Sequence, residues 1–229
     1  MGGKDEDETP FTVHKNLICG RSPFFEAATS GLWRESSSGT VILEYMKLHN
    51  FKIYLQYVYD STTDIGALAK ACGPKCAAYK QCCRDDAARP LTYQRPCELW
   101  VLGDFLRDDG FCNIAIDALI RADDVHFSSI GEDTVEYIYR ETSENSRLQK
   151  WVAKRSLRLM SFGEIEGLRW SGICAEYVLD LWEGCVLDKD SVGTCEMIPE
   201  SDRCKYHRHT EGKEGCFRRA LKVGRELIH

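Results

Sequence analysis

The sequence has no long hydrophobic run. Its 229 residues are 43% apolar, yet nowhere do about 20 consecutive apolar residues occur, which is the length that a helix needs to span a bilayer. The amino terminus also lacks the apolar segment of a secretory signal peptide. We therefore expect no membrane partner and a cytoplasmic or nuclear location.

The chain also has no excess of basic residues. Thirty lysines and arginines stand against 36 aspartates and glutamates, which gives a formal net charge of -6. Proteins that bind nucleic acids need clustered basic side chains to contact phosphates. We therefore expect no nucleic-acid partner. The acidic start of the chain predicts a solvated, flexible tail over residues 1–10.

Sequence motifs for catalysis are missing. The chain contains no glycine-rich phosphate loop, no serine nucleophile elbow and no His-Glu-x-x-His zinc motif. His14 carries an imidazole, and Cys19 carries a thiol five residues later. A nucleophile and its base must also be held within hydrogen-bond reach. We predict that the chain is not an enzyme and has no catalytic residues.

Cysteine, by contrast, is abundant. Twelve cysteines would indicate a disulfide framework in a small secreted chain, but without an export signal they are expected to be reduced thiols. Cys112 and Cys174 lie on apolar faces of expected helices. Free cysteine often serves as a small core residue, so no reactivity follows from these positions.

Apolar periodicity then marks the secondary structure. The β-branched run Val41–Tyr45 stands between turn residues and predicts a buried strand. Asn50 is a plausible N-cap for a following helix, since residues 51–58 carry an apolar stripe at spacings of three and four. Residues 99–106 and 111–120 predict two more apolar helices, with a break at residues 108–110.

Five motifs follow one another along this part of the chain. In order they are Phe11-Thr12-Val13-His14-Lys15, Arg21-Ser22-Pro23-Phe24-Phe25, Trp33-Arg34-Glu35-Ser36, Phe51 with Val58-Tyr59, and Asn113-x-Ala115-Ile116-Asp117-Ala118-Leu119. Together they resemble the BTB/POZ domain, and most closely the small BTB proteins of filamentous fungi. The resemblance covers residues 11–122.

The resemblance implies an α+β fold, in which a small β-sheet is flanked by a cluster of helices. It implies that F-x-V-H-K ends a strand and that R-S-P-F-F begins a helix. Because residues 1–10 make a poor strand, we expect the sheet to lack the strand that ordinarily precedes F-x-V-H-K. After the domain we expect an α-helical C-terminal extension over residues 123–229, with Ser146 as the cap of one of its helices.

In function, the resemblance implies a protein–protein interaction module, because BTB domains mediate association. Trp33 and Glu35 fit the hydrophobic-x-Glu pattern of adaptors in cullin-RING ubiquitin ligases, although they could equally cap the sheet and bond a backbone group. Phe24 and Phe25 fit a homodimer surface, where we expect at least one of them to be buried, and Tyr54 and Tyr59 are added as partner-binding candidates. A self-associating scaffold or transcription-linked regulator without a ligase role is the alternative.

Residues 62–97 replace a connection that is short in the family, and they contain five cysteines. Connections of this length are unusual unless they are functional. The arrangement Cys72-x3-Cys76-x5-Cys82-Cys83 admits a thiolate metal site. It lacks the usual C-x2-C spacing of zinc sites, however, so a variable surface insertion is the favoured interpretation, with Pro90 and Pro96 in an exposed loop.

The C-terminal extension contains a second group of metal-binding residue types. Cys204, His207, His209 and Cys216 gather two thiols and two imidazoles within thirteen residues. Zinc favours four such ligands in a tetrahedral arrangement. Spacing alone produces many false matches, so the sequence leaves two alternatives open, a zinc-binding C-terminal module and a chain without a cofactor.

Overall fold

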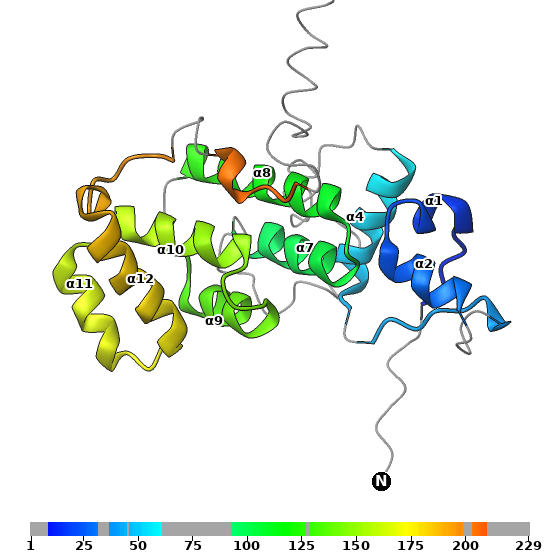
Figure 1. The fold of residues 1–229 in the computed structure, drawn as a ribbon, viewed down its shortest axis with the longest axis horizontal. Coiled ribbons are helices and arrows are strands. Elements are labelled where there is room, and N and C mark those ends of the chain that lie inside the picture. The colour runs from blue at the N-terminus through cyan, green and yellow to red at the C-terminus, as the bar shows by residue number, and fades with distance from the viewer. Residues whose placement is uncertain are drawn as a thin grey trace, which may run out of the picture.

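The computed structural model describes residues 9–31, 37–44, 46–60, 93–126, 129–198 and 203–209. Over these residues the chain folds into helices joined by loops (Figure 1). The α-helices are α1 (Lys15–Cys19), α2 (Pro23–Ser30), α4 (Leu48–Tyr59), α7 (Gln94–Phe105), α8 (Asp109–His126), α9 (Glu132–Glu141), α10 (Arg147–Leu159), α11 (Phe162–Gly167) and α12 (Ala175–Leu187). Three short 3-10 helices are η1 (Leu168–Trp170), η2 (Lys189–Ser191) and η3 (Cys204–Tyr206).

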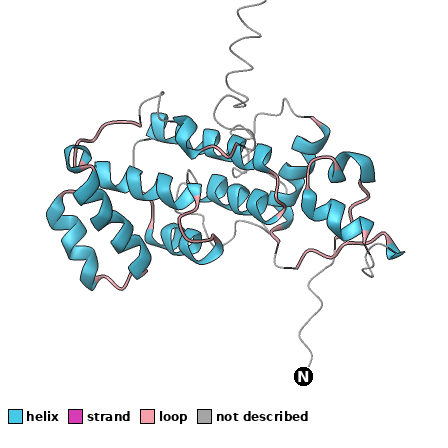
Figure 2. Cartoon of the chain, in the orientation of Figure 1, coloured by secondary structure: helices cyan, strands magenta, loops and turns pink. Residues whose placement is uncertain are grey.

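The predicted α+β fold with a small β-sheet is wrong for this part of the chain. Among the described residues there is no β-strand, and Figure 2 shows helices and loops alone. Val41 and Leu43 still turn inward and pack on the core while Ile42 is 69% exposed. Side-chain alternation is therefore present, but a strand also needs a neighbour for its backbone groups, and the described residues supply none.

The F-x-V-H-K segment is extended in the same way and forms no strand. His14 has extended backbone angles just before α1. Phe11 packs edge-on against Phe51 of α4, with ring centroids 5.4 Å apart. Side-chain packing, and not a β-ladder, therefore holds this segment against the helices.

The core is built around the hairpin of α7 and α8. The two helices are joined by residues 106–108 and so run antiparallel, with Trp100, Phe111 and Leu119 fully buried between them and their neighbours. Gly103 allows the helices to approach closely, because a Cβ there would lie 2.9 Å from the Cys112 sulfur. The two predicted helices are separated by a break, but it lies at residues 106–108 and not at 108–110, because Asp109 and Gly110 already belong to the first turn of α8.

Two local predictions near this hairpin are wrong. α4 begins at Leu48, so Asn50 is not its N-cap, and its amide instead donates a 2.9 Å hydrogen bond to Glu98 of α7. Pro96 does not lie in an exposed loop but in the buried first turn of α7, where proline is tolerated because the first N–H groups have no helical partner. The end of the predicted insertion, 62–97, is thus part of the core, with Cys97 fully buried.

The described residues after α8 are helical, whereas α8 itself runs across the predicted domain boundary at residue 122. The Ser146 cap is confirmed, since its hydroxyl accepts a 3.1 Å hydrogen bond from the Gln149 N–H at the start of α10. A buried ion pair between Arg155 of α10 and Asp123 of α8 joins this extension to the hairpin. Tyr93 donates a 3.1 Å hydrogen bond to the same carboxylate, so α10 is fixed to the core by charge as well as by packing.

None of the described helices combines the length and the apolar character that crossing a bilayer requires.

Candidate functional site

The R-S-P-F-F motif forms the start of α2. Ser22 is its N-cap and accepts a 3.3 Å hydrogen bond from the Phe25 N–H, while Pro23 takes the first helical turn, which suits its fixed backbone angle. The Ser22 hydroxyl also donates a 2.5 Å hydrogen bond to the Leu106 carbonyl at the end of α7. One buried serine thus caps α2 and attaches it to the core hairpin.

The F-x-V-H-K motif positions α1 against α4. Tyr59 accepts a 3.0 Å hydrogen bond from the His14 N–H, and its hydroxyl lies 2.8 Å from His14 Nδ1. Arg21 donates a 2.9 Å hydrogen bond to the Tyr57 hydroxyl and covers its ring. Tyr59 itself is 49% exposed, so it contributes to both the contact with α1 and the surface.

The two phenylalanines of the motif have different environments. Phe25 is buried, as expected for at least one of the pair, and packs edge-on against Phe24 with ring centroids 5.3 Å apart. Phe24 is half-buried and lies 4.9 Å from the ring of Phe105, which is 46% exposed at the end of α7. Phe24 and Phe105 therefore form an apolar surface pair, which we call the aromatic edge.

Tyr54 is fully buried and does not contribute to this surface. Its hydroxyl donates a 3.3 Å hydrogen bond to Asp108, which also accepts a 2.9 Å hydrogen bond from the Phe111 N–H at the start of α8. Burial raises the pKa of Tyr54, and the negative charge of Asp108 adds to the effect. The role of Tyr54 that the geometry supports is to hold α4 against the beginning of α8.

The remaining partner-binding candidates, Trp33 and Glu35, lie outside the described residues, as do Cys72, Cys76, Cys82 and Cys83 of the insertion.

The thiol and the imidazole that the sequence placed five residues apart, Cys19 and His14, do not pair in the structure. Cys19 and His14 bond different partners, since the Cys19 sulfur lies 3.3 Å from the Thr29 hydroxyl while His14 contacts Tyr59. Burial raises the pKa of the Cys97 and Cys112 thiols. Because the thiolate is the reactive form, these two cysteines are core residues and not nucleophiles.

Three of the four predicted zinc ligands converge in space. The potential ligand atoms of Cys204, His207 and His209 all lie within 4.8 Å of one another. The Cys204 sulfur is 3.2 Å from His209 Nε2, and the two imidazole rings stand edge to face, 5.9 Å apart. Cys216, the fourth predicted ligand, lies outside the described residues. We call the three described residues the Cys/His cluster.

The segment that carries the Cys/His cluster runs along α8 in the opposite direction (Figure 1). One guanidinium nitrogen of Arg203 contacts both carboxylate oxygens of Asp124, at 2.8 and 2.9 Å. His207 Nε2 lies 3.1 Å from Asp117, about two turns nearer the beginning of the helix, where both side chains are buried. Residues 203–208 are therefore attached to α8 by side chains that follow one helical face.

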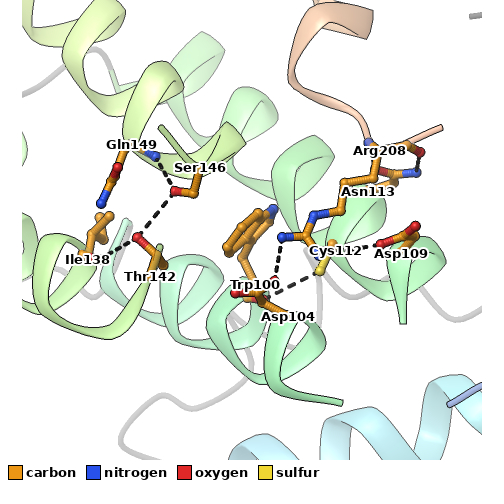
Figure 3. A network of polar contacts seen from close by, with 10 residues as sticks. All are labelled: Trp100, Asp104, Asp109, Cys112, Asn113, Ile138, Thr142, Ser146, Gln149 and Arg208. Atoms are coloured by element: carbon orange, nitrogen blue, oxygen red, sulfur yellow. Dashed lines mark hydrogen bonds and ion pairs between the residues drawn. The ribbon is translucent and has the colours of Figure 1, made fainter. Parts of the chain in front are cut away.

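Arg208 completes this attachment at the beginning of α8. Its backbone N–H donates to the Asn113 side-chain oxygen, and its carbonyl accepts a 2.9 Å hydrogen bond from the Asn113 amide. Its guanidinium lies over the Trp100 ring, 4.7 Å from the centroid, and pairs with Asp104 of α7 (Figure 3). A cation at this place also offsets the negative charge that Asp104 and Asp109 bring to the hairpin.

Sequence reasoning missed the residues of α8 that receive this segment. Asn113, Asp117 and Asp124 are spaced at four and seven residues, which places them on one face of the helix. Asn113 and Asp117 are buried, and a buried carboxylate needs a partner. The signal was thus a polar stripe on an apolar helix, but it does not say which distant segment supplies the partner.

Comparison with known proteins supports the resemblance that the motifs indicated. The BTB/POZ domain family model matches residues 4–72, so the resemblance to that domain is confirmed. BTB/POZ domains are protein-interaction modules, which supports a protein–protein interaction role for this part of the chain. The fungal relationship and the domain boundaries of 11–122 stay predictions. No curated protein and no solved structure matches the chain.

Proposed function

We propose that the chain is a BTB/POZ adaptor that associates with itself through the aromatic edge, Phe24 and Phe105. The observation that carries the proposal is that a motif matched by the family model places one phenylalanine in the core and directs the other to an exposed aromatic ring of α7. Large aromatic side chains at a surface are well suited to anchor an interface, since they bury much apolar area at little entropic cost.

The contacts behind the aromatic edge support a surface that is rigid before a partner arrives. Ser22 fixes the start of α2 to the end of α7, and Arg21 fixes the same loop to Tyr57. Preorganised side chains lose less entropy on binding than mobile ones do. A second copy of the chain would therefore meet Phe24 and Phe105 already in place.

Light scattering of the purified chain over a range of concentrations tests self-association. We expect a dimer for the wild type and a shift toward monomer for Phe105→Glu, because a carboxylate at the edge would have to be desolvated. Trp170→Glu is the matched control, since Trp170 is an exposed aromatic residue of η1, 83% exposed, outside the aromatic edge. A wild type that stays monomeric, or a dimer that only the control disrupts, would contradict the proposal.

A finer version of the same function is recruitment of a client protein to a cullin-RING ubiquitin ligase. It rests on the resemblance of Trp33-Arg34-Glu35 to the adaptor pattern. A pull-down with a cullin should recover the wild type and lose the variant Trp33→Ala with Glu35→Ala, while Trp170→Ala should bind as the wild type does. Equal recovery of all three proteins would remove the ligase role and leave the self-associating scaffold.

A further inference from the structure

We propose that Cys204, His207 and His209 bind a zinc ion, and that Asp117 of α8 orients His207 toward it. The ion would cross-link residues 204–209, and Asp117 would join the site to α8 through His207. This metal site is independent of the aromatic edge and of any protein partner, so it holds or fails separately from the proposed adaptor function.

The spacing of the ligand atoms is close to what zinc requires. Tetrahedral zinc with Zn–S near 2.3 Å and Zn–N near 2.0 Å separates its ligand atoms by about 3.3 to 3.6 Å. In the Cys/His cluster all the candidate atoms lie within 4.8 Å of one another, and the Cys204 sulfur is already 3.2 Å from His209 Nε2. Side-chain movements of about 1 Å would therefore bring the three groups around one ion.

The chemical types of the ligands select among metals. One thiol and two imidazoles form a soft to borderline set, which suits zinc, whereas calcium and magnesium take oxygen ligands. The cluster contains no carboxylate as a direct ligand, and Asp117 instead contacts the far side of an imidazole ring. The set is therefore that of a zinc site and not that of an alkaline-earth site.

Asp117 gives the cluster a feature that a chance group of side chains would lack. Its carboxylate lies 3.1 Å from His207 Nε2 in a buried place. A proton held on Nε2 leaves Nδ1 with the lone pair that a metal needs, and metal-binding histidines commonly donate their other N–H to a carboxylate in this way. Asp117 is thus a positioning residue, acting on the metal through His207.

The neighbouring contacts hold the cluster in place from both ends. Arg203, just before Cys204, pairs with Asp124, and Arg208, between the two histidines, is held by Asn113 and Asp104. None of these contacts involves a ligand of the proposed site. They hold the residues on both sides of the cluster against α7 and α8, so little of the site has to be ordered when the ion binds, which favours affinity.

The proposed site consists of the three described side chains. Cys216, the fourth ligand that the sequence predicts, lies outside the described residues and stays a sequence prediction.

Metal analysis of the full chain, expressed with zinc and purified without chelators, is the first test. We expect about one zinc per chain in the wild type and in Cys195→Ser, a control at an exposed cysteine. We expect loss of the metal in Cys204→Ser and His207→Ala. A wild type without zinc, or full zinc in Cys204→Ser, would overturn the site.

A variant could lose zinc because it unfolds and not because it lacks a ligand. Cobalt substitution in the wild type avoids this ambiguity, because it reports the ligands without any mutation. Tetrahedral cobalt bound to a thiolate should give strong visible bands together with a near-ultraviolet sulfur-to-metal charge-transfer band. Chelator should abolish these bands while circular dichroism shows that the helices persist. A pale octahedral spectrum with no charge-transfer band would contradict coordination by cysteine.

Competition with a zinc chelator tests the role of Asp117. The variant Asp117→Asn should bind zinc about 10- to 100-fold more weakly, as expected when a hydrogen-bond partner of a ligating histidine is lost. Asp124→Asn is the matched control, because it weakens the attachment of Arg203 on the same helical face but does not contact a ligand. Equal zinc affinities for wild type and Asp117→Asn would remove the positioning role.

Discussion

The two ends of the described chain are attached to the core hairpin by different means. At the amino-terminal end, α1 and α2 meet the hairpin through a helix cap, tyrosine hydroxyls and aromatic rings, and several of these side chains are half exposed. At the other end, the segment 203–209 is held along α8 by carboxylates that face arginine and histidine. Hydroxyls and aromatic rings thus attach the amino-terminal helices, whereas ion pairs attach the segment 203–209.

We expect changes that leave a buried charge without its partner to cost more stability than changes at the amino-terminal helices, which hydroxyls and aromatic rings attach. The largest effect is expected for Asp123→Asn, which removes the carboxylate that faces the buried guanidinium of Arg155. Breaking a buried ion pair from one side costs about 3–5 kcal/mol. Urea unfolding measures the loss, with Arg140→Ala as the control, since the exposed Arg140–Glu141 pair should leave the midpoint unchanged. A midpoint for Asp123→Asn like that of the control would contradict the prediction.

An intermediate effect is expected for Gly103→Ala, inside the α7–α8 hairpin. The added Cβ would lie 2.9 Å from the Cys112 sulfur and 3.1 Å from the Cys112 backbone nitrogen, and overpacking of this kind costs about 1–3 kcal/mol. Gly163→Ala in α11 meets nothing within 4 Å and should instead stabilise by about 0.4–1 kcal/mol. If thermal unfolding shows that both variants change stability in the same direction, the close approach of α7 and α8 at Gly103 would not explain the effect.

A smaller effect is expected at the amino-terminal end for Ser22→Ala. It removes the cap of α2 and the hydrogen bond to Leu106, and loss of an N-cap costs about 0.5–2 kcal/mol. Ser30→Ala, at the exposed end of the same helix, removes only a hydroxyl that bonds the Glu26 carbonyl. The two variants can be compared by chemical denaturation, where a loss for Ser30→Ala as large as that for Ser22→Ala would count against the capping role.

The smallest effect is expected at Asp108, which lies in the connection between α7 and α8 and accepts a hydrogen bond from Tyr54 of α4. Burial raises the pKa of this carboxyl above its ordinary value of 3.8. The protonated form is thus favoured in the folded state, so the contribution of Asp108 to stability is complete below pH 3.8 and is lost as the pH rises through the folded-state pKa. Relative to Asp108→Asn, the wild type should therefore lose stability between acidic and neutral pH, and a constant difference in unfolding free energy would contradict this.

Local features of the fold were predictable from the sequence. The Ser146 cap and the break between α7 and α8 depend on residues within one or two turns of each other, which is the range over which caps and turn residues act. The helices of the C-terminal extension were found for the same reason.

Long-range features could not be predicted in the same way. Val41–Tyr45 has the composition of a strand, but a strand exists only with a neighbour, and composition does not identify one. Asn50 has the side chain of a cap, yet a carboxylate 48 residues later, on Glu98, binds it instead. Likewise the spacing of Cys204, His207 and His209 was visible in the sequence, whereas Asp117, 90 residues before His207, was not.

Hydrogen exchange at low and high protein concentration tests most directly the central claim that the two ends serve different purposes. We predict that self-association slows exchange in residues 15–30 and at the end of α7, beside Phe105, and leaves residues 203–209 unchanged. Slower exchange confined to residues 203–209, with none in α1 and α2, would contradict the account.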